Sequence, residues 1–299
     1  MLGLVQDFHG RRTGLGRKSR VLPNSEPVCR IVWSVRAYLL ILDTELTIIT
    51  PRPKGKQDML FKFSRTKNRS HQGMIIPPSD LTPCGRLTAT PEQFYMSACD
   101  EADRVKNEMD LAAKSTILDI GCGAGRLPIG LLARQVPFLS YLGVDVDATR
   151  IKWCNKNLKT RDDRLAFRFV NIKNDRYNPT GKVQFDLGIL GKKFDVIYLY
   201  SVFSHLMQSD VEKYLEIFRD SLTDFGRCFV TMFVADNVPP CTENPPDFSV
   251  LKWQGRLHCV LYNRDNWESM VRDAGLEITK VVPEVNIDGQ TAYYLKRAA

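Results

Sequence analysis

Apolar and polar positions along this chain alternate between short continuous apolar runs and stripes with helical spacing. The short runs are rich in β-branched and aromatic residues, which is typical of buried parallel strands. Helical stripes lie between them, and the clearest of these consists of Val211, Tyr214, Leu215, Phe218 and Leu222. This alternation indicates repeated βαβ units closed by a final strand pair. The predicted strands are 116–120, 141–147, 167–172, 194–200, 227–234, 277–282 and 291–296.

Several helix boundaries can be predicted from capping residues. Thr90-Pro91-Glu92-Gln93 has a capping threonine, a proline at the first helical position and a glutamine that completes a capping box. Ser209-Asp210-Val211-Glu212 predicts a second capping box, for a helix that ends at Gly226. Asn263 predicts the start of a helix that stops at Gly275.

The first predicted βαβ unit contains a glycine-rich turn. The strand 116–120 leads into Gly121-Cys122-Gly123-Ala124-Gly125, and a helix is predicted over 126–134. Glycines allow a backbone to approach a ligand closely, and a helix N-terminus offers unpaired N–H groups. The dinucleotide fingerprint needs a glycine at position 126, where this chain has Arg126. The observed pattern, Asp-x-Gly-x-Gly-x-Gly from Asp119 to Gly125, instead resembles the first motif of the class I S-adenosylmethionine (SAM) dependent methyltransferases.

This resemblance implies a fold class and a domain organisation. The expected fold is α/β, with a Rossmann-like seven-stranded methyltransferase sheet that has helices on both faces. The methyltransferase domain is expected over 73–299, and 1–72 is expected to be a basic, weakly structured extension and linker. The phrases "WCNKNL", "YNPTG" and "YSVFSHL" are similar to a group of bacterial small-molecule methyltransferases.

Asp145 is the second candidate for a cofactor contact. It ends the second predicted strand, about twenty residues beyond the glycine turn, where a carboxylate can accept hydrogen bonds from both ribose hydroxyls. The same reasoning applies to SAM and to NAD, so Asp145 indicates an adenosine cofactor without choosing between them. The alternative is a helix cap for the helix that starts near Ala148, although Asp147 fits that role better.

The resemblance implies further contacts to SAM. Asp119 is expected near the amino group of the cofactor, and the glycines are expected to make room for its methionine part and ribose. At the end of the third strand, many relatives have an aspartate that binds the adenine amino group, whereas this chain has Asn171, whose side-chain oxygen can still accept. The implied cofactor-binding set is Asp119, Gly121, Cys122, Gly123, Gly125, Arg126, Asp145, Val146, Asn171, Ile172 and Tyr200.

His205 is the first candidate for a catalytic base. It follows the fourth predicted strand, beside the expected methyl-donor site, and an unperturbed histidine titrates near neutral pH. The alternative is a structural histidine that anchors the start of the next helix. His258 is the second candidate base, and Tyr200 and Tyr262 could line the acceptor pocket or belong to the core.

One apparent motif is set aside. Asn244-Pro245-Pro246-Asp247 resembles the N-P-P-Y signature of methyltransferases that act on adenine or glutamine amides. That signature belongs directly after the fourth strand, whereas here it lies after the fifth strand and lacks the aromatic fourth residue. Its position therefore argues against those two activities.

Charge and cysteine content refine this interpretation. The net charge is +8, and residues 1–79 alone contain 14 Lys and Arg against 5 Asp and Glu. A basic segment of this kind could contact nucleic acid or anionic lipid, or it could be a solvated extension. The apolar stretch 31–50 is interrupted by Arg36, Asp43 and Glu45, so no membrane span is expected. None of the 8 cysteines forms a C-x-x-C pair, which favours reduced thiols in a cytoplasmic protein without a metal site.

Taken together, these features predict a cytoplasmic SAM-dependent methyltransferase that acts on a small-molecule acceptor, with O-methylation favoured over N- or C-methylation. Two alternatives stay open. One is an RNA or protein methyltransferase that docks through the basic N-terminal arm, and the other is a SAM-binding protein without turnover. An NAD-dependent oxidoreductase is disfavoured because the third fingerprint glycine is missing. The sequence predicts no oligomeric state and no particular acceptor.

Overall fold

The computed structural model describes residues 67–82, 88–182, 186–187, 189, 191–246, 248, 255–285 and 288–299. Most of the expected N-terminal extension, residues 1–66, lies outside this range. The description below therefore concerns the remainder of the chain, in which the predicted methyltransferase domain falls.

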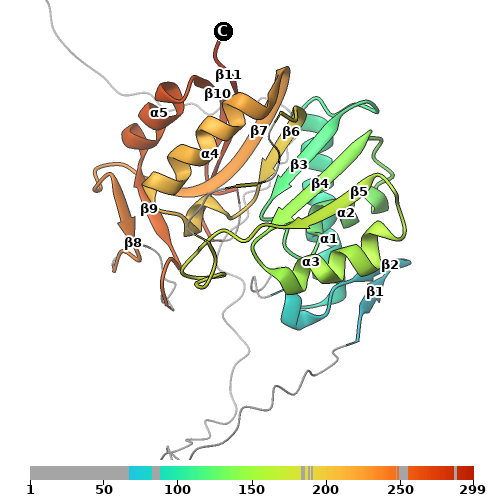
Figure 1. Ribbon diagram of the computed structural model, residues 1–299. Coiled ribbons are helices and arrows are strands. Elements are labelled where there is room, and N and C mark those ends of the chain that lie inside the picture. The colour runs from blue at the N-terminus through green and yellow to red at the C-terminus, as the bar shows by residue number, and fades with distance from the viewer. Residues whose placement is uncertain are drawn as a thin grey trace, which may run out of the picture. The chain divides into compact units, whose positions relative to one another are not determined.

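The core of the structure is a mostly parallel sheet whose strand order matches the predicted α/β class (Figure 1). Its five parallel strands are followed by an antiparallel closing pair, with β11 inserted between β7 and β10. The seven predicted strands are thus confirmed. In spatial order they are β10 (Leu276–Val282), β11 (Thr291–Arg297), β7 (Leu222–Ala235), β6 (Phe194–Leu199), β3 (Thr116–Ile120), β4 (Ser140–Asp145) and β5 (Leu165–Phe169).

Two short strands extend this sheet and were missed in the sequence. β9 (Val260–Asn263) pairs in parallel with the end of β7, and β8 (Cys241–Glu243) pairs with β9 in the antiparallel sense. β8 lies within the proline-rich stretch 236–255, where a strand of only three residues leaves no periodic pattern in the sequence. The extension matters for the site, since it borders the loop that follows β6.

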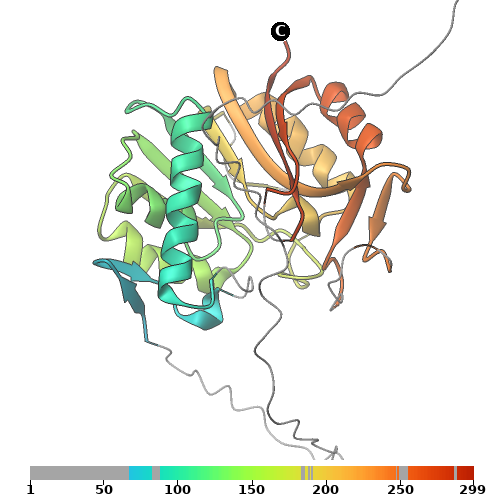
Figure 2. The same ribbon diagram turned by 180° about the vertical axis from the view of Figure 1, so that it is seen from behind.

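Helices cover both faces of the sheet, as predicted. α1 (Pro91–Glu108), α2 (Arg126–Ala133) and α3 (Ala148–Cys154) share one apolar cluster with the sheet, and α3 continues into a π-helical turn over Asn155–Lys159. Figure 2 shows α1 lying along this face. α4 (Gln208–Ser221) and α5 (Arg264–Asp273) contribute to the cluster on the opposite face.

The helix caps are only partly as expected. Thr90 and Gln93 form the predicted reciprocal capping box, Asp147 caps α3, and Asn263 caps α5. The capping box predicted at Ser209 is wrong: α4 begins at Gln208 and has Met207, two residues before Ser209, at its cap without a side-chain hydrogen bond. Its C-terminal boundary was also misplaced, because the chain enters β7 at Leu222 rather than continuing as a helix to Gly226.

A small hairpin precedes α1. β1 (Arg69–His71) pairs with β2 (Met74–Ile76), and the backbone turns between them through Gln72 and Gly73, both with positive φ. The sequence predicted a linker as far as residue 72, whereas residues 69–71 form a strand. Arg69 ties the hairpin to the approach of α1, because its Nε donates to the Pro77 carbonyl at 2.7 Å.

Candidate active site

The glycine turn joins β3 to α2 at the carboxyl end of the parallel strands. The N–H groups of Gly121 and Cys122 both donate to the Val144 carbonyl of the neighbouring strand, at 2.8 and 3.1 Å. Gly121, Gly123 and Gly125 all have positive φ, a conformation that residues with a Cβ adopt only under strain. A Cβ on Gly121 would lie 2.5 Å from the Val202 side chain, whereas one on Gly123 would enter open space. The turn therefore leaves a backbone surface open at Gly123.

Asp145 faces this turn from the end of β4. Its Oδ2 accepts from the N–H of Gly123 at 2.7 Å and its Oδ1 accepts from the N–H of Asp147 at 2.8 Å. Burial raises the pKa of Asp145, while these backbone hydrogen bonds and Arg150 act in the opposite direction. A carboxylate has about four acceptor positions, so each oxygen keeps capacity for a ligand. Because Asp147 caps α3, the two neighbouring acids have separate roles.

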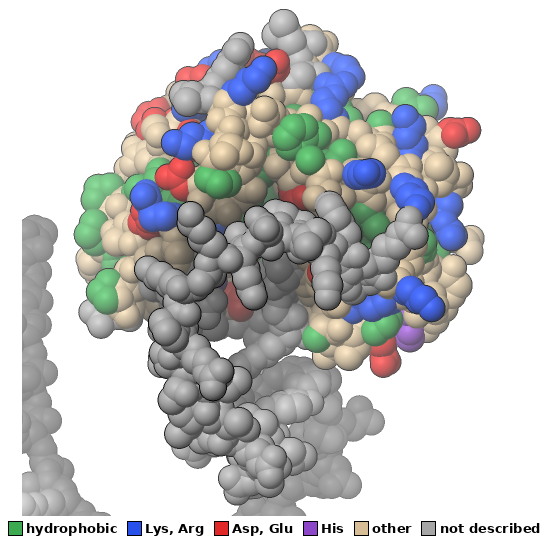
Figure 3. Space-filling view, turned by 60° about the horizontal axis from the view of Figure 1, so that its bottom comes forward, with side chains coloured by type: hydrophobic (Ala, Val, Ile, Leu, Met, Phe, Trp, Pro, Cys, Tyr) green, Lys and Arg blue, Asp and Glu red, His purple; other side chains and the backbone are tan. Residues whose placement is uncertain are grey.

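A pocket opens beside the glycine turn, between the ends of β3, β4 and β6 and the loop that follows β5. Figure 3 shows the molecule turned so that its bottom in Figure 1 comes forward, and basic, acidic and apolar side chains are intermixed on this surface. Nine of the residues predicted from the sequence line the pocket. They are Gly121, Cys122, Gly123, Arg126, Asp145, Val146, Ile172, Tyr200 and His205.

Asp119 does not line this pocket. Its side chain is buried, and its Oδ2 accepts a hydrogen bond from the Tyr141 hydroxyl at 2.5 Å. Burial raises the pKa of Asp119 to about 8, against the lowering effect of that hydroxyl. The structure thus places Asp119 beneath the glycine turn, where it contacts β4.

Gly125 and Asn171 also lie outside the residues that line the pocket. Gly125 is the N-cap of α2, with φ of +81°, and a Cβ there would collide with the Leu158 side chain. Asn171 is exposed, and its side-chain oxygen accepts from the Asn178 amide at 3.1 Å within the loop after β5. Both residues shape segments that border the pocket.

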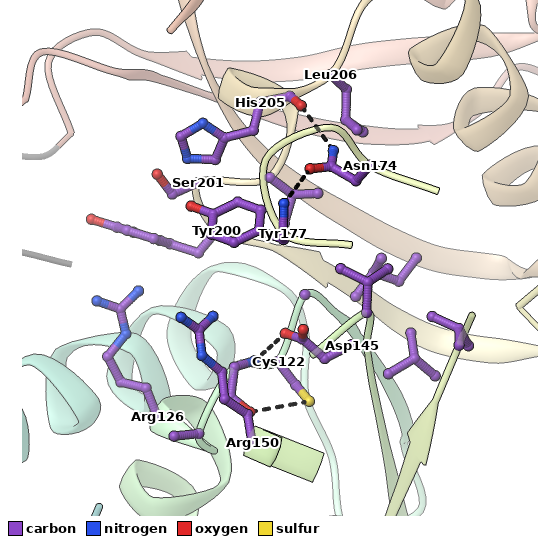
Figure 4. Close-up of a pocket in the computed structure, with 18 of the residues that line it drawn as sticks. Cys122, Arg126, Asp145, Arg150, Asn174, Tyr177, Tyr200, Ser201, His205 and Leu206 are labelled. Atoms are coloured by element: carbon purple, nitrogen blue, oxygen red, sulfur yellow. Dashed lines mark hydrogen bonds between the residues drawn. The ribbon is translucent and has the colours of Figure 1, made fainter. Parts of the chain in front are cut away.

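Two arginines extend into the pocket region from the helices below it (Figure 4). Arg126, at the start of α2, forms an ion pair with buried Glu101 at 2.5 Å, and its guanidinium lies 4.5 Å from the centre of the Tyr200 ring. Arg150, on α3, lies 3.3 Å from the Asp147 carboxylate and 5.8 Å from the Tyr177 ring centre. Arg150 was missed in the sequence because its position is ordinary for a solvent-facing residue of a helix.

The loop after β5 contributes Tyr177, which was also missed. Asn174 organises this loop, because its side-chain oxygen accepts from the N–H groups of Arg176 and Tyr177 and its amide donates to the carbonyl of His205. The ring of Tyr177 meets the imidazole of His205 edge to face at 5.5 Å. No local pattern in the sequence predicts these contacts between the loop and residue 205, because they arise from the tertiary fold.

His205 lies in the short helix η4 (Phe203–His205) after β6. Its Nδ1 is 2.9 Å from the Leu257 carbonyl, and because a carbonyl can only accept, Nδ1 carries the hydrogen. Burial lowers the pKa of His205 to about 4, so the imidazole is neutral at neutral pH. Burial also lowers the pKa of His258, but this second candidate base does not line the pocket.

Ser201 forms the turn out of β6 with φ of +60°, which is uncommon for a residue other than glycine. Its N–H donates to the Thr231 hydroxyl at 2.8 Å, and its hydroxyl accepts from the Gln290 amide at 2.7 Å. Thr231 in turn donates to Gln290 at 2.7 Å, and both of these residues are buried. Strained residues held by such networks often occur at functional sites. No local pattern in the sequence brings residues 201, 231 and 290 together.

A glycine turn and an acidic strand end beside a pocket are typical of nucleotide-binding sites in α/β proteins. Residues 118–228 match a family model described as a methyltransferase domain. This match covers less than half of the chain and agrees with the predicted resemblance to the class I SAM-dependent enzymes, and the strand order agrees with the predicted fold. SAM is the cofactor of that class.

Solved structures with a similar fold include three named methyltransferases. A SAM-dependent methyltransferase from Clostridium acetobutylicum ATCC 824 is 16% identical, with 69% of this chain and 92% of that chain covered and a TM-score of 0.46. The CcbJ methyltransferase from Streptomyces caelestis is 14% identical, with 67% and 90% covered and a TM-score of 0.48. Magnesium protoporphyrin IX methyltransferase from Synechocystis PCC 6803 is 12% identical, with 69% and 83% covered and a TM-score of 0.46. Likenesses of this size assign no acceptor.

Proposed function

We propose that this protein transfers a methyl group from SAM to a small-molecule acceptor, with an oxygen as the favoured methylated atom. The observation that carries the proposal is the hydrogen bond between Asp145 and the Gly123 N–H beside the pocket. It brings the two predicted cofactor elements, the glycine turn and the acidic strand end, to one place.

The residues of the pocket fit the proposed cofactor. Gly123 offers backbone without a side chain, and Asp145 retains acceptor capacity for ribose hydroxyls. Apolar Val146 and Ile172 line the same pocket and could hold an adenine ring. SAM supplies an electrophilic methyl group on a sulfonium. The contribution of the protein would be to position the acceptor and to exclude water.

O-methylation requires that the acceptor lose a proton. His205 is the residue proposed to receive it, because the imidazole is neutral at neutral pH and its Nδ1–H is already committed to the Leu257 carbonyl. The remaining nitrogen, Nε2, then carries the lone pair that a general base uses. Tyr177 and Tyr200 border the same region of the pocket and are the proposed acceptor contacts.

The experiment is thermal unfolding of the protein with and without SAM, S-adenosylhomocysteine, NADH and NADPH. A ligand at about one hundred times its dissociation constant should add roughly 2.7 kcal/mol to the free energy of unfolding. Stabilisation by SAM and S-adenosylhomocysteine alone supports the proposal, and a panel of acceptors would then distinguish turnover from binding without catalysis. Stabilisation only by a nicotinamide cofactor contradicts it.

A second candidate function is methylation of RNA or protein with the basic N-terminal arm as a docking element. The uneven charge favours it, since residues 1–79 contain 14 basic and 5 acidic residues. Binding to RNA should then weaken steeply with salt and disappear on deletion of residues 1–72.

Within the described part of the chain, no helix is both long and apolar enough to cross a membrane. We propose a cytoplasmic location.

A further inference from the structure

The carbonyl that binds His205 belongs to an unusual stretch of backbone just before β9. Leu257 has φ of +50°, the left-handed region, although it is not a glycine, and its side chain is buried. Such a conformation is unfavourable for leucine and persists only where surrounding contacts impose it. The contacts that impose it come from the end of β8.

Glu243, the last residue of β8, holds this backbone from one side. Its Oε1 accepts from the N–H of Leu257 at 2.8 Å and from the Nε of Arg256 at 2.8 Å. The peptide group before Leu257 is thereby fixed by a charged acceptor, and hydrogen bonds of this type are roughly twice as strong as neutral ones.

Asn244 holds the same backbone at both of its ends. Its side-chain oxygen accepts from the N–H of Cys259 at 2.9 Å, and its amide donates to the carbonyl of Gly255 at 2.9 Å. Its own N–H donates to the Cys259 carbonyl at 2.7 Å. Asn244 is the asparagine of the N-P-P sequence that was set aside as a catalytic signature, and these contacts account for the residue in structural terms.

We propose that Glu243 and Asn244 are positioning residues that aim the Leu257 carbonyl at His205 and thereby fix its imidazole as the Nδ1–H tautomer. The catalytic meaning of this role rests on the proposed function, in which Nε2 of His205 accepts the proton of the acceptor. The two strands added to the sheet, β8 and β9, then serve to set the chemistry of a residue that follows β6.

Other groups also face His205, and their influence on the imidazole must be distinguished from that of Glu243 and Asn244. The charges of Arg176, from the loop after β5, and of His258, adjacent to Leu257, lower the pKa of His205, whereas a backbone hydrogen bond with His258 raises it. The ring of Tyr177 packs against the imidazole. Arg256 is also ion-paired with Asp175 of that loop at 3.7 Å. The test therefore reads the position of the hydrogen on the imidazole rather than pKa alone.

The test is ¹⁵N NMR of protein labelled only at histidine, recorded at pH 7 without cofactor or acceptor. The chain contains 4 histidines, and a His205→Gln sample assigns the relevant signals. In the wild-type protein the spectrum should show His205 as the Nδ1–H tautomer. In Glu243→Ala the Nε2–H form should become populated, and Glu243→Gln, which keeps an oxygen acceptor, should largely restore the wild-type spectrum.

A matched control and a second variant keep the result interpretable. Glu277→Ala removes a glutamate that forms an ion pair with Lys296 on the outer strand pair, and it should leave the spectrum unchanged. If Glu243→Ala does not fold, Asn244→Asp is measured in its place, because it loses only the donor to Gly255. An unchanged His205 tautomer in folded Glu243→Ala, or in folded Asn244→Asp where Glu243→Ala does not fold, would overturn the proposal. An Nε2–H tautomer in the wild-type protein would overturn it as well.

The rate of methyl transfer provides a second, separate test of the positioning role. With an identified acceptor, Glu243→Ala should lower kcat by at least about tenfold while the dissociation constant for SAM stays within about twofold. If no acceptor is ever methylated but the tautomer changes as described, the positioning role stands and the proposed function falls. If turnover is found and the tautomer does not respond, the proposed function stands and the positioning role falls.

Discussion

The two walls of the pocket are built in different ways. The glycine wall, residues 121–125 with Asp145, consists largely of backbone whose hydrogen bonds run between neighbouring parallel strands. The side-chain wall, Asn174, Tyr177, Ser201 and His205, depends on partners far away in the chain, including Leu257 and Gln290. A wall made of backbone can change little without loss of the fold, whereas a wall made of side chains can be altered to suit an acceptor. The cofactor is therefore expected at the first wall and acceptor specificity at the second.

The largest effect should come from the glycine wall. Gly125→Ala should lower the free energy of unfolding by about 3 kcal/mol, because the added Cβ meets Leu158 at a backbone conformation unfavourable for alanine. Gly123→Ala should cost only about 1 kcal/mol, since its Cβ enters open space, but it should abolish stabilisation by SAM. Urea unfolding with and without SAM measures both changes. Equal losses of stability in the two variants would contradict this distinction.

His205→Ala addresses the side-chain wall. Loss of a general base should reduce kcat about a hundredfold, equivalent to about 2.7 kcal/mol, and should spare the affinity for SAM. Because burial lowers the pKa of His205 to about 4, the wild-type rate should not decline between pH 7 and pH 5 through titration of this group. Steady-state kinetics checks both statements. A variant with the wild-type rate would assign His205 a structural role.

Asp119, which lies beneath the glycine wall, makes the stability of the folded protein depend on pH. Burial raises the pKa of Asp119 to about 8 in the folded protein, above its ordinary value of 3.8, so the folded state holds a proton that the unfolded state releases. Its stabilising contribution is complete below pH 3.8 and is lost as pH rises through 8. Between pH 6.5 and 8 the free energy of unfolding of the wild-type protein should fall by about 2 kcal/mol more than that of Asp119→Asn, because asparagine at position 119 does not titrate. Urea unfolding at both pH values measures the difference, and parallel profiles would contradict the raised pKa.

The smallest effect is expected from the network under Ser201. Gln290→Ala removes a partner from two hydroxyls, those of Ser201 and Thr231, and should destabilise the protein by about 1 to 2 kcal/mol. It should also raise KM for the acceptor more than the dissociation constant for SAM, because Ser201 lines the pocket. Calorimetric binding of SAM, measured beside acceptor kinetics, separates the two. An equal change in both constants would mean that the two walls are not independent.

The contrast between the walls also explains what could be predicted. The strands, the glycine turn and the cap at Asp147 depend on residues close together in the sequence, so local sequence patterns predict them. Arg150 and Tyr177 occupy positions that look solvent-facing, and only the packing of α3 against the loop after β5 brings them to the pocket. β8 was missed because three residues among prolines have no periodicity. Asp119 was predicted near the cofactor, and its hydrogen bond from Tyr141 of the adjacent strand could not be predicted from local sequence.

The insertion of β11 between β7 and β10 has a consequence for the order of events during synthesis. β11 leaves the ribosome after the other strands of this sheet, yet it occupies an interior position of the sheet. Until it arrives, β7 has an open edge on that side, and Gln290, which immediately precedes β11, cannot reach Ser201. The glycine turn, made much earlier, can already have closed on β4. A nascent chain would thus acquire its cofactor wall well before its acceptor wall, and the open edge of β7 would be the surface most in need of protection from aggregation during that interval.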